Sequence, residues 1–250
     1  MAEKPARRMS EIPADVLAEL NAGRLASRNL VEGLAIDFVQ LLAAAAPEFA
    51  GESPFEISGV GLLKRMALIG DALRSRFGVD GFHRFAVHPS DTVRGWAAYL
   101  LCSAPELSIA EKLDGIRVLA DDAHFGVREW AWLALRPSVV ERADDSIRLL
   151  TPWTKEDSAN IRRFASEITR PRGVWCAHVK ELKDDPELGL PILEPLRADP
   201  SKYVQDSVAN WLNDAGKSKP KWVKALCKRW RKESPTPQTL RICTRASRNL

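Results

Sequence analysis

The sequence lacks an apolar run long enough to cross a membrane. A transmembrane helix needs about 20 consecutive apolar residues, and charged residues, which make up 28% of the 250 residues, interrupt every hydrophobic stretch before that length. The first residues, MAEKPARRMSEIP, are followed by no apolar segment of the kind found in secretory signals. We therefore expect a cytoplasmic protein with no membrane partner.

Cysteine and histidine are too few and too scattered to indicate a metal site. The four cysteines form no CxxC pair, and the four histidines show no ligand spacing. The sequence also contains no P-loop, no GxGxxG after a strand and nothing resembling a Ser-His-Asp arrangement. These absences argue against nucleotide hydrolysis and redox chemistry, and we expect neither a metal nor a cofactor.

The alternation typical of β-strands is also scarce, and helical patterns dominate. In residues 60–77, Leu62, Met66 and Ile69 recur at three- and four-residue steps, and Gly78 follows as a predicted C-cap. Residues 14–22 and 30–46 are predicted to be helices as well. The sequence therefore predicts an all-α protein.

A repeat organises most of the chain. Four stretches share one pattern: DTVRGWAAYLL (91–101), GVREWAWLAL (126–135), SANIRRFASEI (158–168) and SKYVQDSVANWL (201–212). Their first β-branched residues, at positions 93, 127, 161 and 204, are 34, 34 and 43 residues apart. A fifth, weaker copy is predicted in TLRICTRASRNL (239–250). Second helical patterns lie between the copies, at 106–120, 138–150, 177–184 with 187–197, and 220–231.

Paired helices at this period predict an α-solenoid of HEAT-like repeats, curved, with a concave basic groove. We expect one domain over 1–250, with a flexible N-terminus at 1–12, N-terminal helices at 13–87 and repeats at 88–250. The alternative is a non-repetitive helical bundle.

Acidic residues are nearly missing from the C-terminal end. Residues 1–150 hold 17 Lys and Arg against 21 Asp and Glu, whereas residues 151–250 hold 20 against 12. Residues 217–250 contain 11 basic residues and one acid, Glu233. This asymmetry predicts a polyanionic partner, and the alternative is a solvated basic face.

Aligning the repeats places unusual acids in the predicted concave helices. Glu129 stands two positions after its β-branched residue, and Glu167 stands six positions after its own. Asp214 follows at the end of the next repeat helix. Tyr, Leu and Asn fill the position equivalent to Glu167 in the other repeats, so the repeat itself does not require an acid there. The alternative for each acid is an ordinary salt bridge.

Aromatic residues divide into two groups. Trp96, Trp130 and Phe164 share one aligned position, which predicts a core between repeats. Trp132 and Trp175 have no such counterparts, and we predict that each exposes a face that stacks on a base or a cation. Arginines accompany these residues in the third repeat and the corner that follows it, and they are candidates for binding phosphates by bidentate hydrogen bonds: Arg162, Arg163, Arg170 and Arg172.

Carboxylates and aromatic faces in a basic groove suit a reaction with a cationic intermediate. Carboxylates stabilise an oxocarbenium-like transition state and activate water, as in glycoside hydrolysis.

The segments SANIRRFASEITRPRGVW, GVREWAWLALRP and DPSKYVQDSVANWLNDAGK resemble the AlkC branch of the HEAT-like DNA alkylation repair proteins, the alkylpurine DNA glycosylases. The resemblance covers nearly the whole chain and is strongest over 88–232. It implies cleavage of the N-glycosidic bond of cationic alkylated purines, chiefly N3-methyladenine, in base-excision repair. It also implies double-stranded DNA held bent against the concave face, without flipping of the base into a pocket.

The matching motifs imply roles for particular residues. Glu129 of VREWAW, Glu167 of SEITRPR and Asp214 of LND would be the lesion-facing, catalytic carboxylates. Trp175 of RPRGVW would contact the damaged nucleotide. The remaining predicted DNA contacts are Lys202, Asn210, Lys217, Lys221, Lys224 and Arg245. Some AlkC-type proteins carry a C-terminal immunoglobulin-like domain that helps to grip DNA, and we expect this chain to depart from that pattern as a divergent member without one.

Two other functions stay open at this point. One is a non-catalytic nucleic-acid-binding solenoid, and the other is a protein-interaction scaffold, because a helical-repeat fold does not fix a function. In each case we expect a monomer.

Overall fold

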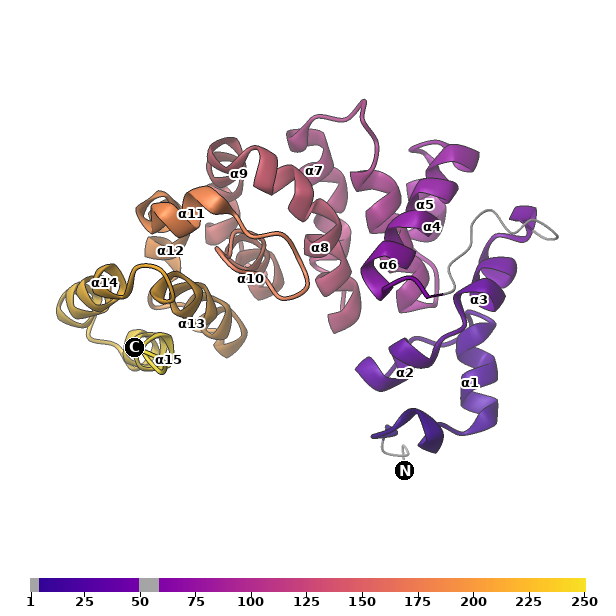
Figure 1. Ribbon diagram of the computed structural model, residues 1–250, viewed down its shortest axis with the longest axis horizontal. Helices are drawn as coiled ribbons and strands as arrows, with labels where there is room; N and C mark the ends of the chain where they lie inside the picture. The colour runs from indigo at the N-terminus through magenta and orange to yellow at the C-terminus, as the bar shows by residue number, and fades with distance from the viewer. Residues whose placement is uncertain (1–4, 50–58) are drawn as a thin grey trace. The chain divides into compact units, whose positions relative to one another are not determined.

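A computed structural model describes residues 5–49 and 59–250 of the chain, and this described part is built from helices without a β-strand (Figure 1). Within it, none of the helices combines the length and the apolar character that a membrane span requires. The prediction of an all-α, helical-repeat protein is confirmed. The chain divides into two compact units, the first formed by residues up to Glu106 with Ala123–Ala134, the second by Leu107–Asp122 with Leu135–Leu250.

The first unit holds the N-terminal helices and the first repeat helix. Its helices are α1 (Ala14–Asn21), α2 (Leu30–Ala35), α3 (Phe38–Ala45), α4 (Leu62–Phe77), α5 (Gly81–Phe85) and α6 (Asp91–Cys102), with the beginning of α8 (Phe125–Glu141). Short 3₁₀ helices occur at Met9–Glu11 (η1) and Pro47–Phe49 (η2).

Two expectations for this unit need adjustment. The helix predicted over 30–46 is two helices, because the Asp37 carboxylate accepts hydrogen bonds from the backbone N–H groups of Val39 (2.9 Å) and Gln40 (3.2 Å) and so starts α3 anew. Of the N-terminal segment expected to be flexible, residues 1–4 lie outside the described residues. The rest includes the η1 turn, and the Ala6 carbonyl accepts a hydrogen bond from Asn29 Nδ2 at 2.7 Å.

The core of the first unit depends on a close approach between α4 and α6. Met66, Ile69 and Leu73 of α4 are fully buried, in agreement with the apolar spacing in the sequence. Gly70 lies so close to α6 that a Cβ atom built on it would come within 2.4 Å of Tyr99 Cβ. Glycine at this position therefore lets the two helices pack in direct contact. The predicted C-cap at Gly78 is also confirmed, with φ at +66°.

The second unit contains the later repeats. Its helices are α7 (Ile109–Ala120), the end of α8, α9 (Ala143–Leu150), α10 (Ala159–Ile168), α11 (Lys180–Asp184), α12 (Leu190–Leu196), α13 (Lys202–Gly216), α14 (Pro220–Glu233) and α15 (Pro237–Ala246), with 3₁₀ helices η3 (Thr151–Lys155) and η4 (Pro186–Gly189). Helix α8 continues through Pro137 to Glu141, so the helix predicted over 138–150 is divided between α8 and α9.

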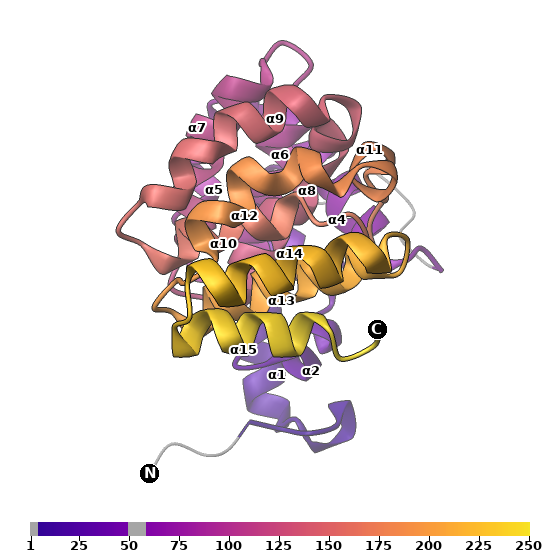
Figure 2. The same ribbon diagram turned by 90° about the vertical axis from the view of Figure 1, so that its left-hand side faces the viewer.

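The repeat helices of the second unit pack side by side. Helix α13 contacts α10 on one side and α15 on the other, while α12 and α14 cover them as the second members of the pairs (Figure 2). Val204, Val208 and Trp211 of α13 are fully buried between these neighbours. This packing brings the C-terminal ends of α10 and α13 together, where Glu167 and Asp214 lie.

Candidate functional site

Two acids from neighbouring repeats meet at the ends of α10 and α13, joined by one arginine. Arg170 donates from Nη1 to Glu167 Oε1 at 2.6 Å, and from Nε and Nη2 to Asp214 Oδ2 at 2.9 and 2.7 Å. Glu167 and Asp214 are 4% and 3% exposed. Because the two acids are 47 positions apart in the chain, only the packing of α10 against α13 brings them to a common partner. We call Glu167, Arg170 and Asp214 the carboxylate seam.

Glu167 is held ionised in spite of its burial. Burial would raise its pKa, but the charges of Arg163 and Arg170, with hydrogen bonds from Ser207 and Arg170, outweigh that effect and lower the pKa below its ordinary value. Ser207 Oγ donates to Glu167 Oε2 at 2.7 Å, and Arg163 Nη2 lies 3.5 Å from the same oxygen. The seam thus contains a carboxylate that stays charged well below neutral pH.

The charge of Arg170 is fixed in the same way. Burial would lower the pKa of its guanidinium, but Glu167 and Asp214 raise it by their charges and by accepting its hydrogen bonds. Glu167 and Arg170 are therefore both held in their charged forms by their partners in the seam.

A second buried arginine holds the segment that follows α10. Arg136, near the end of α8 in the second unit, is 1% exposed. It donates to the backbone carbonyls of Ile168, of Arg170 at 2.6 Å and of Ala177 at 3.0 and 3.1 Å. Burial lowers the pKa of this guanidinium, and the charges of the nearby seam carboxylates offset part of that effect. Arg136 therefore positions the corner from which Arg170 reaches into the seam.

The corner itself presents a tryptophan to solvent. The Val179 N–H donates to the Pro171 carbonyl at 3.2 Å and so closes the loop between them. Trp175 lies in this loop with 62% of its surface exposed, and its φ of +62° makes it the one non-glycine residue with a positive φ in the described part of the chain. The prediction that Trp175 exposes its ring is confirmed. A bulky residue in this strained conformation is a signal of function rather than of stability.

The outer edge of the seam carries positive charge from Lys217 and Arg172. Lys217 Nζ donates to Asp214 Oδ1 at 3.0 Å, and its side chain is 53% exposed. Arg172 donates from Nη2 to Ser218 Oγ at 2.6 Å, which ties the loop after α10 to the turn after α13. Both residues are among the predicted DNA contacts; Lys217 lies beside Asp214, and Arg172 lies beside the turn that follows α13.

Glu129 and Trp132 lie in the first unit, on the beginning of α8. Trp132 Nε1 donates to Glu129 Oε2 at 2.8 Å, one turn away on the same helix. Trp132 is 3% exposed, so the prediction that it exposes a stacking face is wrong. Its indole is inside the protein, and its only polar atom is bonded to Glu129. Glu129 remains half-buried at the surface.

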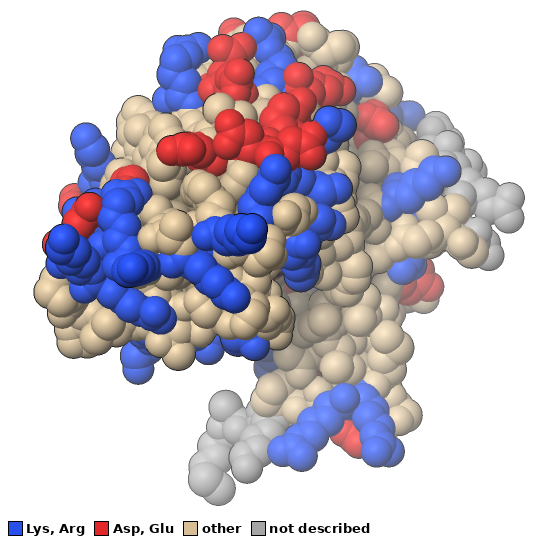
Figure 3. All heavy atoms as spheres, turned by 60° about the vertical axis from the view of Figure 1, so that its left-hand side comes forward, with Lys and Arg blue, Asp and Glu red and all other residues tan. Residues whose placement is uncertain are grey.

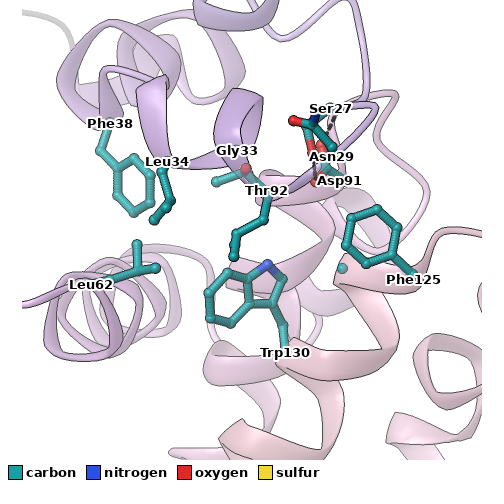
Figure 4. A pocket seen from close by; sticks show the side chains of 12 residues that line it. Ser27, Asn29, Gly33, Leu34, Phe38, Leu62, Asp91, Thr92, Phe125 and Trp130 are labelled. Atoms are coloured by element: carbon teal, nitrogen blue, oxygen red, sulfur yellow. Dashed lines mark hydrogen bonds between the residues drawn. The ribbon is translucent and has the colours of Figure 1, made fainter. Parts of the chain in front are cut away.

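Trp130 differs from its aligned partners. Trp96 and Phe164 are buried, as predicted for a repeat core, whereas Trp130 is half-buried and lines a surface pocket of the first unit. Figure 4 shows Trp130 and Phe125 of α8 at this pocket, opposite Leu34 and Leu62. The core prediction is therefore correct for two of the three aromatic residues and wrong for Trp130.

Three of the arginines predicted to bind phosphate are committed to partners within the protein. Arg162 donates to both oxygens of Asp199, at 2.6 and 3.1 Å, and to two backbone carbonyls. Arg163 lies over the ring of Tyr203 at 4.5 Å and beside Glu167, and Arg170 belongs to the seam. Their guanidiniums bond to protein groups, and their contacts with phosphate stay predictions.

The other predicted DNA contacts lie at the surface. Lys202, Lys221 and Lys224 are exposed. Asn210 accepts a hydrogen bond from Arg248 at 3.0 Å, and Arg245 pairs with Asp206 at 2.9 Å. Their presence on α13, α14 and α15 places them all on the second unit, the half of the chain with the basic excess.

Sequence reasoning did not find Ser207 and Arg136. Ser207 completes the hydrogen bonds of Glu167 and itself accepts from Ser166 at 2.8 Å. Ser207 could have been found in the sequence, because it stands in the middle of a repeat helix where an apolar residue would be expected in the core. Arg136 stands in an otherwise apolar helical run, WLALRP, which indicates a buried arginine with internal partners. Among the described residues, no cluster of His, Cys, Asp and Glu is arranged to hold a metal ion.

The chain resembles DNA alkylation repair proteins in sequence and in fold. A family model described as "DNA alkylation repair enzyme" matches residues 127–245. The uncharacterized protein YhaZ of Bacillus subtilis is 34% identical over 125 residues, which are 50% of this chain and 34% of YhaZ. This chain therefore matches only about a third of the length of that relative.

Solved structures show the same fold. The alkylpurine DNA glycosylase AlkC of Pseudomonas fluorescens, bound to DNA containing an abasic site analog, superposes with a TM-score of 0.67 at 24% identity, covering 97% of this chain and 64% of that chain. AlkD2 of Streptococcus mutans superposes with a TM-score of 0.65 at 19% identity, covering 82% of this chain and 96% of that one.

Proposed function

We propose that this chain is a DNA glycosylase that removes cationic alkylated purines from double-stranded DNA, because residues 127–245 match the family model described as "DNA alkylation repair enzyme". Its substrates on this proposal are bases of the N3-methyladenine type, its product is an abasic site, and its place is base-excision repair in the cytoplasm. It acts as a monomer and uses neither metal nor cofactor.

The observation that carries the proposal is the carboxylate seam beside an exposed indole. Glu167 and Asp214, buried and bonded to Arg170, lie at the ends of α10 and α13, and the chain continues from α10 into the loop that exposes Trp175. Ionised carboxylates attract a developing positive charge, and an indole face attracts a cationic base. This pairing fits a reaction in which the substrate base and the sugar are each cationic at some stage.

The reaction needs little acid catalysis. Alkylation gives the purine a positive charge, so that the base leaves as a neutral molecule when the bond between C1′ and nitrogen breaks and the electron pair goes to the nitrogen. The sugar then carries the positive charge, and a water molecule attacks C1′ and loses a proton. A carboxylate near C1′ stabilises the cationic sugar and accepts the proton.

The contacts of each carboxylate decide which one we propose to stabilise the cationic sugar and which one we propose to accept the proton from water. Glu167 is surrounded by donors from Ser207, Arg163 and Arg170, which suits a fixed electrostatic role. Asp214 has one oxygen bonded to Arg170, while its Oδ1 accepts from the exposed Lys217. When Lys217 turns to a DNA phosphate, Oδ1 becomes available to water. Asp214 is therefore the proposed proton acceptor, and Glu129 is the proposed third carboxylate at the lesion.

The test is the release of base from methylated duplex DNA. Purified protein is incubated with duplex treated with a methylating agent, and free 3-methyladenine and 7-methylguanine are measured by mass spectrometry. We expect release by the natural protein and a loss of at least 100-fold in single-turnover rate for D214N, E167Q and E129Q, each about 3 kcal/mol of transition-state stabilisation. D145N is the matched control, because Asp145 pairs with Arg142 and Arg148 at the surface away from the seam.

A second candidate function is lesion binding without cleavage. It is favoured by the pairing of both seam carboxylates with arginines, which leaves less negative charge for a cationic sugar. In that case, methylated duplex binds more tightly than unmodified duplex, yet no base is released by the natural protein. Equal affinity for the two duplexes, with no release, would contradict both candidates.

A further inference from the structure

Helix α14 carries a row of basic side chains along its solvent face. Its buried residues, Val223, Leu226, Cys227 and Trp230, form one apolar stripe that packs on α13 and α15. The opposite face carries five exposed cations at steps of three, four, three and one residues: Lys221, Lys224, Lys228, Arg231 and Lys232. At 1.5 Å per residue this row, the α14 stripe, is about 16 Å long. In Figure 3, blue Lys and Arg side chains gather over the C-terminal helices that come forward in that view.

The α14 stripe is not neutralised by the protein. Among residues 5–49 and 59–250, no Asp or Glu forms an ion pair with any of its five side chains. The one acid of α14, Glu233, pairs instead with Arg229 at 3.2 Å, and Arg229 also pairs with Glu194. Elsewhere in the second unit, cations such as Arg162 and Arg170 have carboxylate partners.

Helix stability does not explain this arrangement. Like charges three and four residues apart on one helix face repel, and the stripe contains several such pairs. Lys221 also lies in the first turn, where the helix dipole disfavours a cation. A solvent-facing helix needs polar side chains for solubility, but side chains of both charges satisfy that need without repulsion.

The partner of this surface is an extended polyanion and not a membrane. The apolar side of α14 is buried against α13 and α15, with Trp230 fully covered, so that no apolar face is left to enter a lipid layer. A DNA duplex carries a phosphate charge every 1.7 Å along its axis, so a row of 16 Å faces several phosphates at once. Binding to the stripe requires only regularly spaced negative charges. The spacing of the phosphates does not depend on the base sequence or on a lesion.

We propose that the α14 stripe is a second DNA-binding surface, which contacts phosphates of undamaged duplex and is separate from the carboxylate seam. The choice of DNA as the partner rests on the proposed function, but binding at the stripe does not require base excision. The role of the stripe is to keep the protein bound to DNA of any sequence while the seam contacts the lesion.

The experiment is a salt titration of binding to an undamaged duplex of about 20 base pairs, followed by fluorescence anisotropy between 50 and 200 mM NaCl. The stripe variant is K221Q/K224Q/K228Q/K232Q in the full chain. The matched control, K64Q/K112Q/K155Q/K183Q, removes the same charge from lysines outside α14. Circular dichroism and thermal unfolding establish that both variants are folded.

We expect the slope of log K against log salt to fall in magnitude by up to about 3.6 in the stripe variant, since each lost phosphate contact removes about 0.9. Between 50 and 200 mM NaCl, a slope difference of this size changes the ratio of the two proteins' binding constants by roughly 100-fold. The control variant should keep the slope of the natural protein. A stripe variant with the natural slope and affinity would overturn the proposal. So would loss of binding to phosphatidylserine vesicles with binding to the duplex unchanged.

The outcome is distinguishable from a failure of the proposed function. Release of methylated base is measured at saturating protein in single turnover for K228Q/R231Q/K232Q, which changes only stripe residues that are not among the predicted DNA contacts. If the natural protein releases base, this rate should stay within about twofold in that variant, because the seam is intact. If the natural protein releases none, the glycosylase proposal fails, while the salt slopes still decide whether α14 binds DNA.

Discussion

Arg170 bridges Glu167, three residues before it, and Asp214 on another helix, through hydrogen bonds of 2.6 to 2.9 Å. Both carboxylates are buried, and each depends on this guanidinium to offset the cost of removing its charge from water. The seam is therefore at once a structural link between α10 and α13 and the centre of the proposed chemistry.

Replacing Arg170 should destabilise the protein strongly. In R170Q both carboxylates stay buried with less compensation, and we expect the free energy of unfolding to fall by about 3 to 5 kcal/mol. Urea denaturation measures the change. R148Q, which breaks an exposed pair with Asp145 at 3.2 Å, should cost less than about 1 kcal/mol. Equal effects of the two variants would contradict the view that the seam supports the fold.

Acid should remove a contribution that Glu167 makes to stability. Because its pKa is lower in the folded chain than its ordinary value of 4.5, the ionised carboxylate stabilises the fold above that pH, and this contribution is lost as the pH falls through the folded-state pKa. The difference in unfolding free energy between the natural protein and E167Q should be constant from pH 7 to 5 and then narrow toward pH 3. A difference independent of pH down to 3 would show that Glu167 is not preferentially ionised in the fold.

The positive φ of Trp175 should separate stability from activity. W175A keeps the unfavourable backbone conformation, whereas W175G adopts it without strain, so W175G should be the more stable of the two by about 1 kcal/mol. Both variants lack the indole and should lose base release alike. Thermal unfolding and the base-release assay give the two readouts. Restored activity in W175G would mean that the backbone, and not the ring, matters for the reaction.

Arg136 should control the order of the loop that carries Trp175. Its guanidinium bonds three carbonyls at the two ends of this corner, and in R136K a single ammonium cannot reach all of them. We expect faster hydrogen exchange of backbone amides in residues 170–179, together with loss of stability. Amides of α14, which make no contact with Arg136, serve as the internal reference. Unchanged exchange in 170–179 would contradict this positioning role.

Much of the fold followed from local patterns. The apolar spacing in 60–77, the repeated β-branched residues and the prolines and glycines between segments predicted α4, the repeat helices and most of their partners. These features depend on which residues are three or four positions apart, and that information is in the chain. The break at Asp37 was missed although its capping bonds to Val39 and Gln40 are local, and the passage of α8 through Pro137 was missed because tolerance of proline depends on the packing around the helix.

The sequence alone determined that the chain forms paired helices, that acids stand at Glu129, Glu167 and Asp214, and that positive charge collects toward the C-terminus. Tertiary structure decided how those groups are used. It turned Trp132 inward and Trp175 outward, paired Arg162 with Asp199, and brought Glu167 and Asp214 to one arginine. The reason is physical: the partner of a buried charge is set by how helices from distant parts of the chain pack, and no local pattern encodes that register.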